Sequence, residues 1–207
     1  MSGWSTFFGQ WLREPLGIGS MLPSGPAVGR AVARLVDCGD GGVILELGGG
    51  TGSLTDGLLK AGCPADRLVT VERAPNLARV LAARFPDVRV VVGDAAKLGA
   101  IAADLGIERV AAVVSSLPIK WFPFEAQKAI IDQSFTLMPA DGYFLQLTNA
   151  SASPLPVDRL GLDGAVAGHV WWHVLPMHIW RYQRKAAPRA VPARAPAAAA
   201  MALKRTG

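Results

Sequence analysis

The sequence contains few of the residues that build metal centres or disulfide frameworks. It has only two cysteines, Cys38 and Cys63, and three histidines among 207 residues. The cysteines lack the close spacing of metal ligands, so we expect both to be reduced, half-buried residues of a cytosolic protein. His169, His173 and His178 have no cysteine or acid among them, which favours structural or hydrogen-bonding roles. The sequence therefore predicts no metal site.

Long apolar runs and a leader pattern are also missing. No apolar run reaches the roughly 18 to 20 residues that cross a bilayer, and the N-terminus lacks a basic segment followed by an apolar one. Hydrophobic residues nevertheless make up 51% of the chain, which excludes general disorder and suits a buried parallel sheet. We therefore expect one folded domain without a membrane-spanning helix or a secretory signal.

Acidic residues are absent from the C-terminal end. From Arg181 onward there are seven lysines and arginines and no acid, whereas the rest of the chain has 14 basic and 16 acidic residues. The formal net charge of +5 is therefore a property of this end. Residues 186–207, which are rich in Ala and Pro, are expected to form a disordered basic tail. Such a tail either contacts anionic lipid or nucleic acid or serves only solubility.

A glycine-rich loop stands between a short apolar strand and a helix. The apolar run 43–47, in a strand expected over 42–47, carries one acid, Glu46, and the loop Gly48–Gly52 precedes a helix expected over 53–61. Glycines permit positive φ angles and let a ligand approach the main chain, and the helix start offers free N–H groups. The sequence therefore predicts a nucleotide-like ligand at this loop.

The spacing of the glycines argues against a dinucleotide. A dinucleotide loop follows G-x-G-x-x-G, whereas Glu46, Gly48, Gly50 and Gly52 form E-x-G-x-G-x-G. This pattern resembles that of class I S-adenosylmethionine-dependent methyltransferases. The resemblance implies that the loop, with Thr51, binds S-adenosylmethionine and that S-adenosylhomocysteine is the product. It also implies that Glu46 meets the cationic end of the cofactor, directly or through water.

Two more acids follow strands further along the chain. Glu72, with Arg73 after it, ends a strand expected over 67–72, where an acceptor for ribose hydroxyls belongs. The next strand leads into Gly93, Asp94 and Ala95, and the methyltransferase pattern sets this aspartate against the adenine amino group. One acid at a strand end is usually only solvated. Three acids at successive strand ends after a glycine loop predict a cofactor site.

Apolar strands and helices alternate over most of the chain, which predicts an α/β fold with a parallel sheet. Two further strands are expected at 169–174 and 177–182, joined by Leu175 and Pro176. The resemblance implies a Rossmann-like class I methyltransferase fold, a mostly parallel seven-stranded sheet that ends in an antiparallel hairpin. The other expected strands are 42–47, 67–72, 88–93, 109–115 and 142–148, and the expected helices are 26–36, 53–61, 75–85, 95–104 and 124–138.

An aromatic segment precedes the sheet and ends at Pro15. We expect a helix over 1–15, followed by the methyltransferase domain over 16–185. Its apolar stripe either packs on that domain or lies in a membrane interface, where Trp and Phe partition well. Ser24, before Pro26, is a cap for the next helix, a cofactor contact, or both. The stripe, with residues recurring at three- and four-residue steps, consists of Trp4, Phe7, Phe8, Trp11 and Leu12.

The fourth expected strand ends in Ser115, Ser116, Leu117, Pro118 and Ile119. The rRNA adenine dimethyltransferases carry Asn-Leu-Pro-Tyr here, and the tyrosine stacks on the target base. Stacking contributes about 1–3 kcal/mol per base, and this chain has isoleucine in its place. The sequence therefore favours an amine that is not part of a flat base. The two serines and the Leu117 carbonyl are the candidate catalytic groups that orient this amine.

Over residues 5–184, the chain resembles the small bacterial phospholipid N-methyltransferases, which make phosphatidylcholine from phosphatidylethanolamine. A departure is Asn149, where the family pattern has tyrosine after Gln-x-Thr. The resemblance rests on the following groups: Phe7-Phe8, Trp11-Leu12-Arg13 and Pro15; Pro23-Ser24 and Pro26; Glu46-Leu47-Gly48 with Gly50-Thr51-Gly52; Val71-Glu72-Arg73; Arg84-Phe85-Pro86; Gly93-Asp94-Ala95; Ser115 with Leu117-Pro118; Gln146 with Thr148; and Trp180-Arg181-Tyr182.

The resemblance implies a peripheral membrane enzyme on the inner face of the plasma membrane. It would bind a phospholipid membrane with anionic lipid and add up to three methyl groups to the phosphatidylethanolamine amine. Neither nucleic acid nor metal would be a partner. Two alternatives remain open: an RNA methyltransferase like the rRNA adenine N6-dimethyltransferases, which the basic pI of about 9.6 supports, and a lipid-binding protein with an inactive cofactor site.

Overall fold

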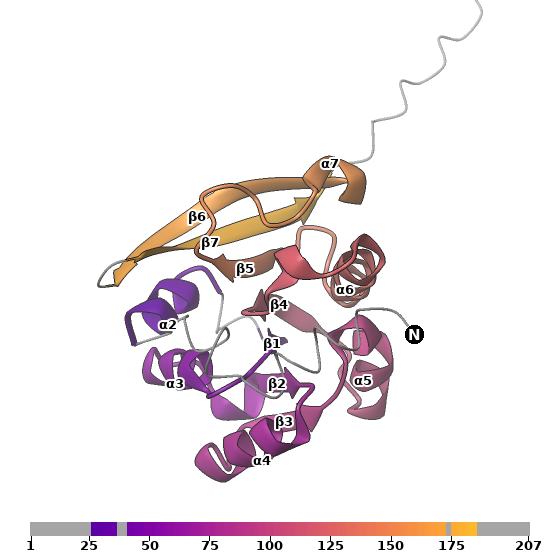
Figure 1. The fold of residues 1–207 in the computed structure, drawn as a ribbon. Helices are drawn as coiled ribbons and strands as arrows, with labels where there is room; N and C mark the ends of the chain where they lie inside the picture. The colour runs from indigo at the N-terminus through magenta and orange to yellow at the C-terminus, as the bar shows by residue number, and fades with distance from the viewer. Residues whose placement is uncertain (1–25, 37–40, 173–174, 186–207) are drawn as a thin grey trace, which may run out of the picture.

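The computed structural model describes residues 26–36, 41–172 and 175–185. They build one seven-stranded sheet in the order β3-β2-β1-β4-β5-β7-β6 (Figure 1). The first five strands pair in parallel, and β7 is antiparallel to both β5 and β6. The strands are β1 (Val43–Leu47), β2 (Leu68–Glu72), β3 (Arg89–Val92), β4 (Val110–Ser115), β5 (Phe144–Thr148), β6 (Leu162–Trp172) and β7 (Leu175–Arg184).

Helices cover both faces of the sheet. One core layer holds side chains of α2, α3 and α4, and the other holds side chains of α5, α6 and α7. This arrangement follows from the parallel crossovers, which require a helix between successive strands. The helices are α2 (Pro26–Ala33), α3 (Ser53–Lys60), α4 (Pro75–Arg84), α5 (Leu98–Asp104), α6 (Phe124–Leu137) and α7 (Val157–Leu160), with 3-10 turns η2 (Ala65–Arg67), η3 (Ala95–Lys97) and η4 (Ile119–Trp121).

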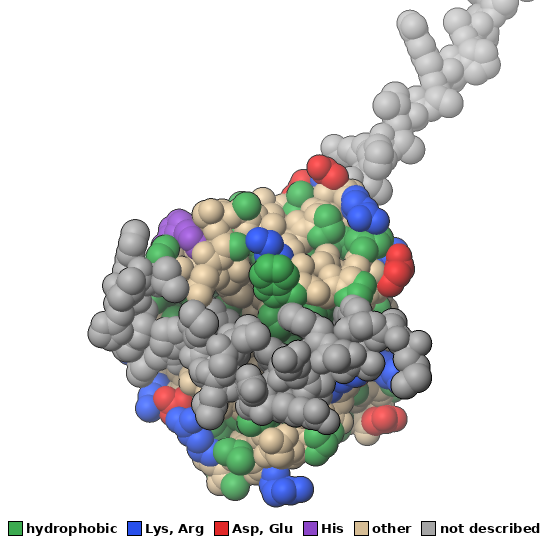
Figure 2. Space-filling model, in the orientation of Figure 1, with side chains coloured by type: hydrophobic (Ala, Val, Ile, Leu, Met, Phe, Trp, Pro, Cys, Tyr) green, Lys and Arg blue, Asp and Glu red, His purple; other side chains and the backbone are tan. Residues whose placement is uncertain are grey.

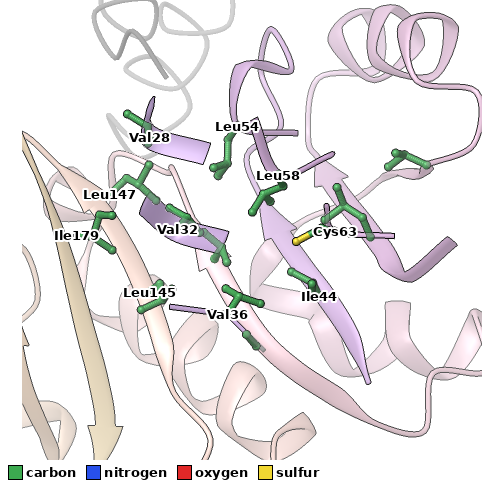
Figure 3. Close-up of a cluster of buried hydrophobic side chains, with 14 of the residues drawn as sticks. Val28, Val32, Val36, Ile44, Leu54, Leu58, Cys63, Leu145, Leu147 and Ile179 are labelled. Atoms are coloured by element: carbon green, nitrogen blue, oxygen red, sulfur yellow. The ribbon is translucent and has the colours of Figure 1, made fainter. Parts of the chain in front are cut away.

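The core layer beneath α2 and α3 is drawn in Figure 3, where Val32 and Leu58 point toward Ile44 of β1. The two helices touch closely, because a Cβ built on Gly29 would lie 2.1 Å from the Cα of Gly57. Only glycines permit this approach. The contact fixes α3, and therefore the glycine loop before it, against the sheet.

The cysteine expectation is wrong for Cys63, which is buried below α3 and disulfide-bonded. Its sequence distance from Cys38 gave no signal of a bond, since bridging depends on how the fold brings chain segments together. Cys38 itself lies outside the described residues. So do the expected helix 1–15, Ser24, His173 and the tail 186–207.

The predicted fold class and the C-terminal antiparallel hairpin are confirmed, but the hairpin is longer than expected. β6 begins at Leu162 rather than near residue 169, because glycines and alanines hide the strand pattern before His169. Leu175 and Pro176 form the start of β7 and not the turn. N-terminal to His178, β7 pairs with β6 but not with β5, and a strand free on one side tolerates the missing N–H of Pro176.

The hairpin also contains an irregularity. In the pairing of β6 with β7, Val166 faces Trp180 and Gly168 faces Ile179, so Ala167 is skipped as in a β-bulge. Across the described part of the chain, no helix is long and apolar enough to cross a bilayer.

Glu46 places a carboxyl group in the core. It is fully buried on β1, and its Oε2 accepts hydrogen bonds from the hydroxyls of Thr55 (2.7 Å) and Thr70 (3.0 Å). Its Oε1 has no hydrogen-bond partner among the described residues. Burial raises the pKa of this carboxyl from its ordinary 4.5 to about 7, against the opposing effect of the two hydroxyls.

We expect this carboxyl to make stability pH-dependent. Between the ordinary value of 4.5 and the folded value of about 7, the folded state holds a proton that the unfolded state has lost. The free energy of unfolding therefore falls as pH rises through this window. Glu46→Gln keeps an acceptor for both threonines and removes the titration. Relative to this variant, wild type should lose on the order of 1–3 kcal/mol between acidic and neutral pH.

Urea denaturation at a series of pH values measures this difference. Glu125→Gln, an exposed change on α6, is the matched control and should leave the pH profile unchanged. A constant offset between wild type and Glu46→Gln at every pH would show that Glu46 has the same pKa in both states.

Candidate active site

The glycine loop packs tightly against its neighbours at both ends but is open in the middle. Gly48 and Gly52 have φ angles of 81° and 79°, in the left-handed region. A Cβ on Gly48 would lie 2.7 Å from the Leu117 side chain, and one on Gly52 would lie 2.5 Å from the Phe85 ring. Gly50 has φ 53°, and a Cβ there would have only the Gly48 carbonyl within reach, at 4.0 Å. Space for a ligand therefore lies over Gly50.

Glu72 links this loop to the next strand end. It is buried at the end of β2, where its Oε2 accepts the N–H of Gly50 at 2.9 Å and its Oε1 accepts that of Ala74 at 2.8 Å. Each carboxylate oxygen can accept a further hydrogen bond. Glu72 also lines the cleft described next, so it is placed to receive ligand hydroxyls.

A cleft opens at the carboxyl ends of β1 to β4, where ligands bind in open α/β sheets. Its empty volume is about 550 Å³, open solvent included. Acidic and basic groups line one part of it, and apolar side chains line the other. The lining residues are Gly48, Val71, Glu72, Arg73, Gly93, Asp94, Ala95, Ala96, Leu117, Phe122, Ala126 and Ile130.

Asp94 follows β3 and caps η3. Its Oδ1 accepts the N–H of Ala96 at 3.0 Å, and the residue lines the cleft beside Gly93 and Ala95. The cap fixes the carboxylate at the cleft and leaves it further acceptor capacity. Two carboxylates, from β2 and β3, therefore border one cavity with apolar walls.

The turn after β4 is fixed by a set of hydrogen bonds. The Ser116 hydroxyl donates to the Gly48 carbonyl at 2.6 Å, and the Ser115 hydroxyl accepts the N–H of Leu117 at 3.3 Å. The Leu117 carbonyl accepts from Nε2 of Gln146, on β5, at 2.9 Å. The candidate catalytic turn is therefore joined to the glycine loop on one side and to β5 on the other.

Two glutamines that were not predicted as site residues, Gln127 and Gln146, hold the site in place. Gln146 appeared only in the family resemblance, yet it is buried, holds the Leu117 carbonyl, and has an Oε1 without a partner among the described residues. Gln127 of α6 donates to the carbonyls of Ile119 and Phe122 and so holds the segment after the turn. The sequence signal that could have indicated both residues is a polar side chain at an otherwise apolar position of a strand or a helix.

Several predicted site residues do not meet at the cleft. Glu46 is absent from the lining and lies in the core beside its two threonines. Thr51 is exposed, with its hydroxyl 3.1 Å from that of Ser53 and its carbonyl accepting from Arg84. Ser24 and the aromatic stripe of residues 4–12 lie outside the described residues.

The histidines that are described form a pair rather than a ligand cluster. His169 and His178 face each other across β6 and β7, with their Nδ1 atoms 2.9 Å apart. Pro176, which was expected to join their two strands, belongs to β7. Within the described ranges, no group of three or more potential metal ligands occurs.

Comparisons with known proteins identify relatives for this fold and site. No protein-family model matches the chain. The ornithine lipid N-methyltransferase of Singulisphaera acidiphila is 33% identical over 151 residues, which cover 72% of this chain and 79% of that protein. The ribosomal RNA small subunit methyltransferase A of Phenylobacterium zucineum is 36% identical over 121 residues, but these cover 55% of this chain and only 41% of that protein.

The solved structures support the same fold. The crystal structure of the glycopeptide N-methyltransferase MtfA complexed with S-adenosylmethionine matches with a TM-score of 0.58 at 17% identity, covering 77% of this chain and 94% of that chain. The match to the lipid enzyme covers more than two thirds of both proteins, and the MtfA structure supports the fold. The chain therefore belongs to the class I methyltransferases, in the family of the lipid N-methyltransferase from Singulisphaera acidiphila.

Proposed function

We propose that the protein transfers methyl groups from S-adenosylmethionine to the primary amine of a membrane lipid. The observation that carries this proposal is the cleft in which Glu72 and Asp94 border a cavity closed on one side by the β4 turn. The similarity to a lipid N-methyltransferase over 79% of that protein supports a lipid as the acceptor.

The residues of the cleft fit the proposed cofactor. Glu72 and Asp94 supply acceptors suited to ribose hydroxyls and an adenine amino group, and Leu117, Phe122 and Ile130 supply an apolar wall for a flat ring. The open space over Gly50 leaves room for a ligand at the main chain. When bound, S-adenosylmethionine supplies an electrophilic methyl group on sulfur.

The turn after β4 is the proposed acceptor site. Ser116, tied to the Gly48 carbonyl, and Leu117, tied to Gln146, present the turn at the edge of the cleft. Carbonyl and hydroxyl oxygens accept hydrogen bonds, so Ser115, Ser116 and the Leu117 carbonyl would orient an amine whose lone pair must point at the methyl group. Holding reactants in line supplies much of the rate of such a displacement. We assign no general base.

The structure also bears on the choice between lipid and RNA. Ile119 stands where the rRNA enzymes carry a stacking tyrosine, and it is buried at 1% exposure. It is therefore unavailable as a platform for a flat base. This observation favours a lipid amine over an adenine.

Among lipid amines, we propose phosphatidylethanolamine as the acceptor and phosphatidylcholine as the final product. Ornithine lipid is the second candidate, favoured by the name of the Singulisphaera relative. We further propose that residues 1–15 bind the membrane surface through Trp4, Phe7, Phe8, Trp11 and Leu12. The basic residues from Arg181 onward would add attraction to the anionic inner face of the plasma membrane.

The acceptor is tested with a radiolabelled methyl donor. Purified protein is incubated with detergent-dispersed phosphatidylethanolamine, with ornithine lipid, or with ribosomal RNA, and the products are separated by chromatography. We expect label in phosphatidylethanolamine and its methylated forms. Label in ornithine lipid alone would reassign the acceptor, and label in RNA alone would refute the proposal.

The cofactor site is tested by Gly50→Ala. The left-handed φ of 53° strains any other residue by about 1–2 kcal/mol, and the new methyl group would occupy the space over the loop. We expect at least about a tenfold loss of S-adenosylmethionine affinity by calorimetry, equivalent to about 1.4 kcal/mol. Gly106→Ala has the same backbone strain at φ 65° in open space away from the cleft, and it should bind normally.

If the two glycine variants bind S-adenosylmethionine with equal affinity, the glycine loop is not part of the cofactor site. Because both variants carry similar strain, a shared loss of stability cannot mimic the expected difference.

The membrane role of the N-terminal segment is tested by deleting residues 1–13. We expect the deletion to reduce co-sedimentation with anionic vesicles, because the amphipathic aromatic stripe is removed. Cofactor affinity should stay near that of wild type. A truncated protein that still sediments fully with vesicles would contradict this role.

A further inference from the structure

The segment after the β4 turn exposes an aromatic residue beside the cleft. Trp121, at the end of η4, is 66% exposed, whereas its neighbour Phe122 lines the cleft. Among the described residues, the other large hydrophobic side chains with high exposure are Val80 and Val92. Tryptophan is highly buried on average, so an indole held in solvent at the mouth of a site indicates a contact surface.

The exposure of Trp121 is built into the fold. Ile119 anchors η4 in the core, and Nε2 of Gln127 donates to the carbonyls of Ile119 (3.0 Å) and Phe122 (2.9 Å). The N–H of Trp121 donates to the Pro118 carbonyl at 3.0 Å. Both flanks of the residue are therefore fixed, and the indole is presented outward by an ordered turn.

Two basic side chains lie next to aromatic rings in this part of the structure, at Trp121 and at Phe124. Nζ of Lys120 lies 5.6 Å from the centroid of the Trp121 ring, and Cζ of Arg159 on α7 lies 3.7 Å from that of Phe124. Neither cation forms an ion pair with a described carboxylate. Glu125 is an exposed acid nearby on α6. On the face drawn in Figure 2, hydrophobic and basic side chains lie side by side.

We propose that Trp121, with Lys120 and Arg159, docks the mouth of the cleft on the surface of a bilayer that contains anionic lipid. Indole rings favour the headgroup region of membranes, and basic side chains are attracted to anionic headgroups. The inference rests on the proposed lipid acceptor, and it adds a docking surface built from described residues of the catalytic domain. With the indole in the headgroup layer, a lipid amine reaches the β4 turn without leaving the bilayer.

The test uses the full chain and vesicles of phosphatidylethanolamine with phosphatidylglycerol, with phosphatidylcholine vesicles as the neutral arm. Trp121→Ala should lower the vesicle partition coefficient about tenfold, since it removes a large apolar contact. Val80→Ala, which truncates a 57% exposed apolar residue on α4, is the matched control and should bind as wild type.

A second pair of variants separates charge from apolar contact. Lys120→Glu should weaken binding to the anionic vesicles and leave binding to the neutral ones unchanged. Lys60→Glu reverses an exposed lysine at the end of α3 and should affect neither. Normal S-adenosylmethionine affinity in every variant shows that the site has folded.

Activity gives an independent readout. Trp121→Ala should methylate phosphatidylethanolamine slowly in vesicles but at the wild-type rate when the same headgroup carries short, water-soluble chains. Unchanged vesicle binding by Trp121→Ala would overturn the docking surface. A wild type that methylates no lipid amine, while Trp121→Ala still loses vesicle binding, would overturn the proposed function and retain the docking surface.

Discussion

The carboxylate of Glu72 is the interaction on which the geometry of the cleft depends. It sits at the end of β2 and receives one backbone N–H from the glycine loop and one from the start of α4. Hydrogen bonds to an ionised acceptor are among the stronger ones in proteins. A single buried side chain therefore fixes two loops from two crossovers relative to each other.

A second connection joins the two halves of the site. The hydroxyl of Ser116 binds the Gly48 carbonyl, and the Leu117 side chain packs where a Cβ on Gly48 would collide. The proposed cofactor loop and the proposed acceptor turn are therefore in direct contact. A displacement of one is transmitted to the other, which suits a reaction whose two partners must lie in line.

Local patterns predicted the fold and the strand ends, because strand periodicity and glycine spacing act over a few residues. The positions of Glu72 and Asp94 at the cleft were predictable for this reason, since each follows or ends a strand. Long-range contacts were not predictable. No local pattern indicates that Glu46 faces two threonines, or which carbonyls Gln127 holds. The start of β6 was missed because its glycines and alanines lack a strand pattern.

The skipped residue Ala167 has a consequence for the protein at high local concentration. β6 is the outermost strand on its side of the sheet, so one row of its backbone amides and carbonyls has no neighbouring strand among the described residues (Figure 1). A straight, regular edge strand of this kind can pair with a strand of another molecule. The bulge interrupts the regular spacing and increases the local twist. At high protein concentration, this irregularity disfavours pairing of β6 edges between molecules and so disfavours aggregation.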